Sequence, residues 1–188
     1  MTPREAVAAV LEVVEVSGAP YVIVGALAYG AYGLPRSTND ADFVVAMPAQ
    51  ELDEVMRRLP PPIAIEPQAR MELFTGTMRW VLAIEGITFK IEVFILGNDP
   101  HHAALFARRR RDRVAMIDRE AWIPTAEDLV IQKLRWARSK DLDDVRNILA
   151  VQGSAIDDAH LEHWCTQHGT LARLAEVRAS IPPDLQAG

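Results

Sequence analysis

Hydrophobic residues recur along the first third of the chain with two periods, one typical of helices and one typical of strands. Thr2-Pro3-Arg4-Glu5 has the spacing of a capping box, and the apolar positions after it keep a helical period to about Ser17. The same reading predicts a strand at 21–25, a short helix at 26–33, a strand at 42–47 and an amphipathic helix at 49–59. The order is therefore helix, strand, helix, strand, helix.

A hairpin is predicted between Thr77 and Leu96, with a two-residue turn at Glu85-Gly86. In this register Arg79 stands opposite Glu92. One face of the hairpin is then wholly apolar. The other face carries polar residues, including Glu92.

The second half of the chain becomes helical after a helix at 99–109 and a short hairpin at 113–123. Thr125 begins a capping-box-like helix start, and a buried stripe follows on its helix at Val130, Leu134 and Ala137. Further helices are predicted at 140–151, 157–168 and 170–180. We therefore expect an α/β (α+β) fold, with an α/β core at 1–124 and a C-terminal helical region at 125–188 packed on it.

Composition narrows the class of protein. The 188 residues are 49% hydrophobic, enough for one sizeable core, and no apolar run approaches the length of a membrane span. The single cysteine, Cys165, has no internal disulfide partner, and no leader opens the sequence, so we expect a cytoplasmic protein. A net charge of -6 weakly opposes nonspecific binding to nucleic acid. No Ser-His-Asp arrangement or dinucleotide glycine fingerprint is visible.

Two carboxylates, Asp40 and Asp42, lie two residues apart where a buried strand is predicted. Side chains at i and i+2 of a strand point the same way, so both carboxylates would face one small volume. Their hard oxygens suit Mg²⁺, which takes its other ligands from water and phosphates. The alternative is a turn at Asn39-Asp40 with solvated carboxylates, although turn chemistry alone does not explain Asp42 inside an apolar strand.

Gly25 and Ala26 follow the first strand and begin the short helix. Because Gly25 has no side chain, a phosphate could approach the backbone, and the positive end of the helix would favour it. Gly25 could instead only permit a tight turn. Arg36 and Thr38 flank the carboxylates and could bind a triphosphate, whereas the alternative for Arg36 is a surface side chain after Pro35.

Together, Gly25-Ala26 and, thirteen residues later, Asp40-x-Asp42 resemble the signature of the nucleotidyltransferase superfamily built on the polymerase β type fold. The longer pattern, with Gly33-Leu-Pro-Arg36-Ser-Thr38 leading into the carboxylates, is similar to the branch of AbiEii-type abortive-infection toxins and their bacterial relatives. The resemblance covers about residues 20–150. It implies a nucleotidyltransferase-like mixed sheet, a third carboxylate on a neighbouring strand, and a helical lysine and a later aspartate that help bind nucleotide.

Glu92 is our candidate for the third carboxylate because it lies on the polar face of its strand, although an ion pair with Arg79 would explain both residues. Lys133 lies beside the buried stripe of its helix and could reach a phosphate. Asp141 or Asp144 would supply the later aspartate, and we choose Asp141. The candidate site therefore comprises catalytic Asp40, Asp42, Glu92 and Lys133, of which the three carboxylates bind metal, and nucleotide-binding Gly25, Ala26, Arg36, Thr38 and Asp141.

Two further patterns lie outside this set. Arginines at 108–111 and 113 could grip an RNA or nucleotide acceptor, or be solvated at a helix end. His160 and His163 have helical i, i+3 spacing, but no cysteine or carboxylate pattern of a metal site lies near them in the sequence. The sequence therefore does not predict a zinc site.

The resemblance implies an enzyme that uses Mg²⁺, or alternatively Mn²⁺, to move a nucleoside monophosphate from a nucleoside triphosphate to a hydroxyl or phosphate of RNA, protein or a small molecule. It also implies a toxin with an antitoxin partner, while the helical tail could instead mediate homo-oligomer formation. We weigh against it an aminoglycoside-type nucleotidyltransferase, which an acidic acceptor cleft would favour. A further alternative is a degenerate module that binds nucleotide or protein without turnover.

Overall fold

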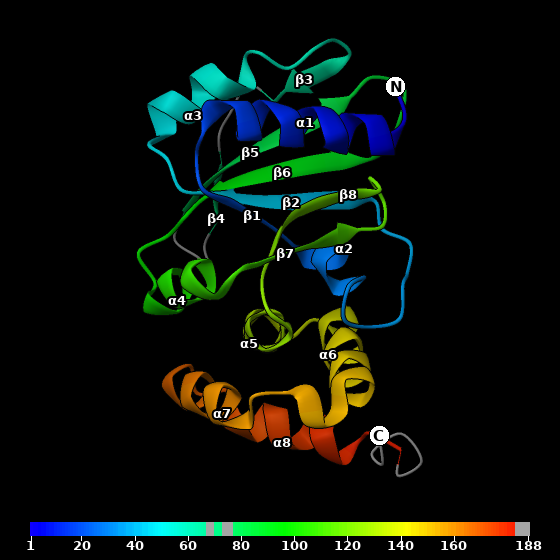
Figure 1. The fold of residues 1–188 in the computed structure, drawn as a ribbon, viewed down its shortest axis with the longest axis vertical. Helices are drawn as coiled ribbons and strands as arrows, with labels where there is room; N and C mark the ends of the chain where they lie inside the picture. Colours follow the sequence, from blue (N-terminus) through cyan, green and yellow to red (C-terminus); the bar gives the residue numbers. More distant parts are fainter. Residues whose placement is uncertain (67–69, 73–76, 183–188) are drawn as a thin grey trace.

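A mixed β-sheet with helices on both faces forms the upper two thirds of the protein, as viewed in Figure 1. The computed structural model describes residues 1–66, 70–72 and 77–182. Within them the strand order is β1-β2-β6-β5-β3, and β4 also pairs with β5. The strands are β1 Tyr21–Val24, β2 Asp40–Val45, β3 Ile63–Ile65, β4 Arg70–Glu72, β5 Thr77–Ile84 and β6 Lys90–Ile95.

The first helix, α1 (Pro3–Ser17), and the helix α3 (Ala49–Met56) cover one face of the sheet, and α2 (Gly25–Tyr29) and α4 (Pro100–Arg108) lie on the other (Figure 1). Alternate residues of the central strands reach the α1 side, where Ile23, Phe43 and Ile91 are fully buried. The predicted capping box is present, because Thr2 and Glu5 exchange side-chain hydrogen bonds with each other's backbone N–H groups.

The pairing of β5 with β6 differs from the predicted hairpin. Val81, not Arg79, lies opposite Glu92, and Arg79 lies opposite Phe94. The connection from Ile84 to Lys90 is longer than a two-residue turn, and it moves the register by two residues. A shift by two preserves which side chains share a face, so Glu92 stays on its predicted face.

Other helices and strands also differ from the sequence prediction. The helix α2 ends at Tyr29 rather than Gly33, and β2 begins at Asp40 rather than at residue 42. The short strands β3 and β4 were not predicted at all. A hairpin of β7 (Arg110–Val114) and β8 (Arg119–Ile123) replaces the prediction at 113–123.

Beyond β8, the described residues form helices, which lie below the sheet in Figure 1. They are α5 (Ala126–Trp136), α6 (Ser139–Gln152), α7 (Asp158–Gln167) and α8 (Leu171–Ala179), with a short 3₁₀ turn η1 (Gly153–Ala155). Ala137, predicted on the buried stripe, instead caps α5 in a left-handed conformation with φ of 53°. The prediction of a mixed sheet flanked by helices with a C-terminal helical extension is confirmed.

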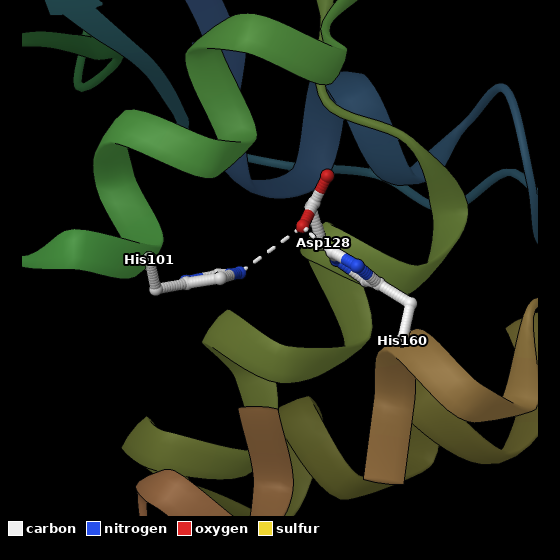
Figure 2. Close-up of side chains that lie close together, drawn as sticks. All are labelled: His101, Asp128 and His160. Carbon is white, nitrogen blue, oxygen red and sulfur yellow. Dashed lines mark hydrogen bonds and ion pairs between the residues drawn. The ribbon is translucent and has the colours of Figure 1, made fainter. Parts of the chain in front are cut away.

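Three helices that are distant in sequence meet at polar side chains. His101 of α4 and His160 of α7 both contact one carboxylate oxygen of Asp128 on α5 (Figure 2).

None of the helices in the described part of the chain combines the length and hydropathy that a bilayer crossing requires.

Candidate functional site

Parallel pairing of β2 with β6 brings the three candidate carboxylates to one region of the sheet. Asp42 lies beside Glu92 in the register, and Asp40 lies beside Lys90. The residue between the two aspartates, Ala41, is buried on the opposite face. Asp40, Asp42 and Glu92 therefore share the face of the sheet that carries α2 and α4.

Gly25 sits against one of these carboxylates. Its φ of +65° lies in the left-handed region, and a Cβ added there would collide with Asp42 Oδ2. Both the backbone conformation and the space thus require glycine at the turn from β1 into α2. The predicted tight turn is present, and it packs directly on Asp42.

Asp42 carries the most perturbed carboxyl group of the set. Burial, followed by the charges of Asp40 and Glu92, raises the pKa of Asp42 from its usual 3.8 to about 7. Arg138 and Lys133 act in the opposite direction. No described residue donates a hydrogen bond to the Asp42 carboxylate, so its charge is poorly compensated by the protein itself.

The other two carboxylates are held by neighbouring side chains. Thr38 Oγ1 lies 2.5 Å from Asp40 Oδ1 and donates to it. Arg79 Nη1 lies 3.0 Å from each carboxylate oxygen of Glu92. This is the ion pair considered from the sequence, formed diagonally across the strands rather than directly opposite.

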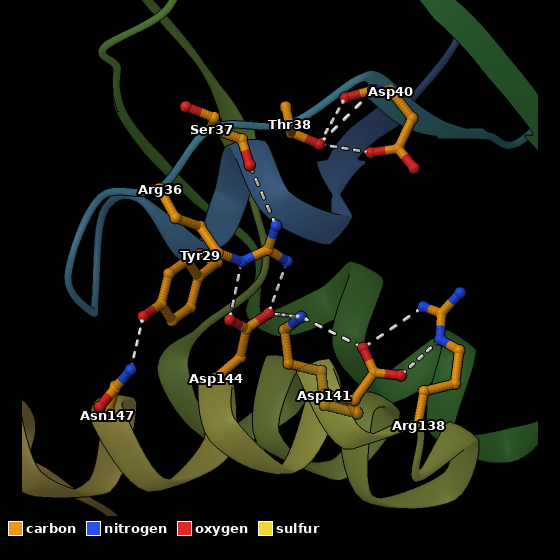
Figure 3. A network of polar contacts seen from close by, with 10 residues as sticks. Tyr29, Arg36, Ser37, Thr38, Asp40, Arg138, Asp141, Asp144 and Asn147 are labelled. Atoms are coloured by element: carbon orange, nitrogen blue, oxygen red, sulfur yellow. Dashed lines mark hydrogen bonds and ion pairs between the residues drawn. The ribbon is translucent and has the colours of Figure 1, made fainter.

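A second group of charged residues connects α5 and α6 to the loop before β2 (Figure 3). Lys133 Nζ lies 2.6 Å from Asp144 Oδ2 and 3.6 Å from Asp141 Oδ1. Arg36 forms a bidentate pair with Asp144, with distances of 2.9 and 2.8 Å. Arg138 in turn contacts Asp141, with Nε 2.6 Å from Oδ2.

Asp144, rather than Asp141, is the centre of this group. Burial acts to raise the pKa of Asp144, but the hydrogen bonds from Arg36 and Lys133 outweigh it and hold that pKa below its usual value. The ion pair also accounts for Arg36, which is neither a free phosphate ligand nor a wholly solvated side chain. Sequence separation hides the contact, because Arg36 and Asp144 are 108 positions apart.

A cavity of about 350 Å³ lies between the sheet and α5. Gly25, Asp42, Lys133 and Asp141 line it, whereas Ala26, Arg36, Thr38, Asp40 and Glu92 are not among the described residues that do. Its apolar wall includes Val24, Val44, Phe94, Leu105 and Phe106. Asp40 and Glu92 adjoin the cavity through Asp42 on the sheet face.

The sequence does not single out Arg138 as a residue of the candidate site. It lines the cavity, and the charges of Asp141, Asp42 and Asp40 all raise its pKa, with the Asp141 hydrogen bond the largest effect. It lies just before α6, in no recognisable pattern. The signal available in the sequence was only its position one turn after Lys133 and close to Asp141.

The predicted arginine patch is largely neutralised by carboxylates. Arg110 pairs with Asp112, and Arg113 pairs with Asp118. Arg108 and Arg111 also contact acidic residues, and Arg109 packs over Trp122 at 4.9 Å. Ion pairing of this kind favours a structural role for the run.

Solved structures with a similar fold are nucleotidyltransferases and a nucleotidyltransferase-like protein. The antibiotic-resistance factor ANT(2″)-Ia matches with a TM-score of 0.60 at 12% identity, over 92% of this chain and 96% of that one. A nucleotidyltransferase-like antigenic protein from Paracoccidioides brasiliensis matches with 0.56 at 14% identity, over 94% and 92%. The lincosamide adenylyltransferase LnuA, solved with lincomycin, matches with 0.53 at 14% identity, over 80% and 98%.

Sequence comparison adds nothing to this relationship, since neither a family model nor a curated protein matches the chain. At identities this low the likeness concerns the fold and not the reaction. The carboxylates of β2 and β6, the turn at Gly25 and the helices beyond β8 are therefore parts of a chain with the nucleotidyltransferase fold.

Proposed function

We propose that the protein is a metal-dependent nucleotidyltransferase that moves a nucleoside monophosphate from a nucleoside triphosphate to an acceptor hydroxyl or phosphate. The observation that carries the proposal is the alignment of Asp42 with Glu92 on neighbouring strands, with Asp40 two residues away on the same face. Of these carboxylates, Asp42 lines a cavity that Lys133 and Arg138 also line.

The carboxylates suit a divalent metal ion on the chemistry of their surroundings. Asp42 combines a raised pKa with the absence of any hydrogen-bond donor among the described residues, which is the environment that a cation would relieve. Oxygen donors alone favour Mg²⁺, or Mn²⁺, over softer metals. Asp40, Asp42 and Glu92 would hold the metal, which would neutralise charge on the phosphate oxygens of a nucleotidyl transfer.

The residues of the chain supply the remaining requirements. Lys133 and Arg138 would attract the triphosphate from the side opposite the carboxylates. Gly25 and Ala26 would let phosphate oxygens approach the backbone N–H groups at the start of α2, on the side of Gly25 that Asp42 does not occupy. Thr38 would hold Asp40 in place through its hydrogen bond, and Asp141 would position Arg138. The apolar wall of the cavity offers a surface for a nucleobase or an apolar part of the acceptor.

The test is transfer of label from each α-labelled nucleoside triphosphate, with Mg²⁺, to RNA, protein and small-molecule fractions of a cell extract. Wild-type protein should label one fraction, and Asp42→Asn should abolish the labelling. Asp143→Asn is the matched control, because that carboxylate is 63% exposed and, within the described part of the chain, pairs only with Arg146 on its own helix. Labelling that persists in Asp42→Asn would exclude the proposed metal site.

One observation favours a second function, nucleotide binding without turnover. Both oxygens of Glu92 already accept hydrogen bonds from Arg79, and an occupied carboxylate is a poorer metal ligand. Tight retention of nucleotide by the intact protein, with no labelled product in any fraction, would support this binding module instead.

The acceptor class is partly constrained by charge. Lys133, Arg135, Arg138 and Arg173 line the cavity, against the carboxylates Asp42 and Asp141. A cavity with this lining favours neutral or anionic molecules over a polycation. It therefore gives less support to an aminoglycoside acceptor than to RNA, protein or a neutral small molecule.

Four expectations rest on the sequence alone. They are the toxin role, an antitoxin partner, a homo-oligomer, and a boundary between core and helical region at residue 124. Growth arrest on expression of the wild type, relieved by Asp42→Asn, would support the toxin role. Unimpaired growth at the same protein level would remove it.

A further inference from the structure

A cluster of two histidines and one carboxylate lies apart from the carboxylates of the sheet, where α4, α5 and α7 meet (Figure 2). His101 Nε2 lies 3.1 Å from Asp128 Oδ1, and His160 Nε2 lies 2.8 Å from the same oxygen. One potential ligand atom from each of the three residues falls within 4.8 Å of the other two. Three ligand atoms from three helices therefore surround a single point.

The spacing is close to that of a tetrahedral metal site. Ligand atoms about 2.0–2.1 Å from a zinc ion lie roughly 3.3 Å from one another. The two distances to Asp128 need only a small expansion to reach this value, and the ligand atoms of the two imidazoles lie within 4.8 Å of each other. Imidazole nitrogen with one carboxylate oxygen is a donor set typical of Zn²⁺ and unsuited to Mg²⁺.

Asp128 is oriented by a second set of contacts. Its other oxygen, Oδ2, accepts a hydrogen bond from Thr125 Oγ1 at 3.0 Å and lies 3.5 Å from Arg108 Nε. These contacts leave Oδ1 directed at the two imidazoles. Outer contacts of this kind fix a ligand carboxylate in a metal site.

The charges around the cluster also favour a bound cation. Arg108 is surrounded by Glu127, Asp128 and Asp157, so carboxylates outnumber the guanidinium. Asp128 is fully buried, and one of its oxygens contacts both imidazoles. A buried carboxylate next to imidazoles is a favourable place for a dication.

We propose that His101, Asp128 and His160 bind one Zn²⁺, or a transition metal ion of similar preference, and that this ion fastens α4 to α5 and α7. His160 is the most accessible ligand, with 12% of its side chain exposed, so water can complete the coordination from that side. Coordination through Nε2 moves each ring proton to Nδ1. His101 Nδ1 is buried without a hydrogen-bond partner among the described residues, and this limits the affinity.

The test begins with protein that has been treated with a chelator and then titrated with Zn²⁺ or Co²⁺. Wild type should bind about one ion per chain, and bound Co²⁺ should give the strong visible absorption of a four-coordinate site. Zn²⁺ should raise the unfolding midpoint by several degrees, whereas Mg²⁺ should not reproduce either effect.

His160→Gln and His101→Gln should each lose the Co²⁺ absorption and the Zn²⁺-dependent rise in midpoint. His163→Gln is the matched control, because His163 is exposed on the same helix, three residues from His160, and should behave as wild type. Circular dichroism establishes that each variant is folded, and His160→Gln, at the least buried position, keeps the test usable if His101→Gln unfolds.

Two outcomes would overturn the proposal. One is wild-type protein that binds no Zn²⁺ or Co²⁺, which would make the cluster a hydrogen-bonded His-Asp-His group. The other is a site whose absorption survives in both histidine variants. Nucleotidyl transfer enters neither measurement, so the result is independent of the proposed enzyme activity.

Discussion

Asp42 is the residue at which the fold and the proposed chemistry conflict most strongly. An ordinary carboxyl group ionises well below neutral pH, whereas Asp42, with a pKa of about 7, stays protonated up to about neutral pH in the folded protein. A metal ligand must lose that proton first. The cost of burying the charge would thus be recovered if the proposed metal ion binds.

Binding of Mg²⁺ should depend on pH. Because Asp42 must ionise, the apparent affinity should fall about tenfold for each pH unit below the pKa of about 7 and level off above it. Isothermal titration with Mg²⁺ between pH 5 and 8 measures this slope. Flat affinity over this range would mean that Asp42 is not a ligand.

The same raised pKa predicts how stability depends on pH without metal. Between the usual 3.8 and about 7, unfolding releases a proton from Asp42, so its contribution to the free energy of unfolding falls as pH rises. Asp42→Asn removes this loss, and the variant should gain stability relative to wild type as pH rises toward 7. Urea unfolding at pH 4.5 and 7.5 checks the sign, with Asp143→Asn as the control.

Gly25 allows a prediction with a matched control. Gly25→Ala and Gly86→Ala both place a side chain at positive φ, of 65° and 84°, which should cost about 1–2 kcal/mol of stability in each. Only at Gly25 would the new methyl group also displace the Asp42 carboxylate, since an added Cβ at Gly86 has no neighbour within 4 Å.

Chemical denaturation and label transfer should therefore separate the two glycine variants. Both should lose stability, and only Gly25→Ala should lose Mg²⁺ binding and transfer. Equal activity in the two variants would show that the close contact between Gly25 and Asp42 has no functional role.

At the scale of elements, the pairing of β6 with both β2 and β5 gives Glu92 two competing neighbours. Asp42 lies beside it in one register, and Arg79 reaches it diagonally from the other strand. The Arg79 and Glu92 side chains are 27% and 23% exposed, so the ion pair contributes no more than about 1 kcal/mol.

This competition makes Arg79→Met and Glu92→Gln an informative pair. If Glu92 holds metal, Glu92→Gln should weaken Mg²⁺ binding and abolish transfer, whereas Arg79→Met should leave Glu92 freer and preserve both. Unfolding by urea should register a similar, small loss for the two variants. Transfer that is equal in both would assign Glu92 to the ion pair alone.

Most elements were predictable because their own residues specify them. The capping residues Thr2 and Thr125 begin helices, and the apolar runs of β1 and β2 form strands. The three-residue strands β3 and β4 carry too few residues for a period to emerge. The register of β5 with β6 was wrong because the connecting loop, and not the glycine within it, sets the pairing.

For the molecule as a whole, one hydrophobic core joins the sheet to the C-terminal helices. Buried residues of α1 and the sheet belong to the same contact cluster as Leu129, Ile131 and Leu134 of α5, and the cluster continues to Ile181. The helical region is therefore part of the folding unit as well as a wall of the cavity.

A chain ended at Pro124 should consequently fail to unfold cooperatively. It would expose the apolar surface that α5 covers, and it would lose Lys133, Arg138 and Asp144 together. Thermal unfolding followed by circular dichroism, with full-length protein as reference, measures this. A sharp transition in the shortened chain would instead support a core at 1–124 that folds by itself.

Long-range contacts limited how much of the candidate site the sequence could predict. Asp40 and Asp42 are neighbours along the chain, so strand geometry alone places them on one face. Arg36 and Asp144, or His101 and His160, meet only because segments that are distant in the sequence pack together. Their spacing in the sequence carries no periodic signal, and it does not distinguish the contacts of Asp141 from those of Asp144.

Asp144 pairs with both Arg36 and Lys133. This carboxylate therefore competes with any anionic ligand for the same two cations. An incoming phosphate gains from these cations only to the extent that it attracts them more strongly than the resident carboxylate does. We expect a ligand with several phosphates to compete with Asp144 for these cations better than a ligand with a single phosphate. Asp144 would thus select ligands by their charge, independently of the base or the sugar.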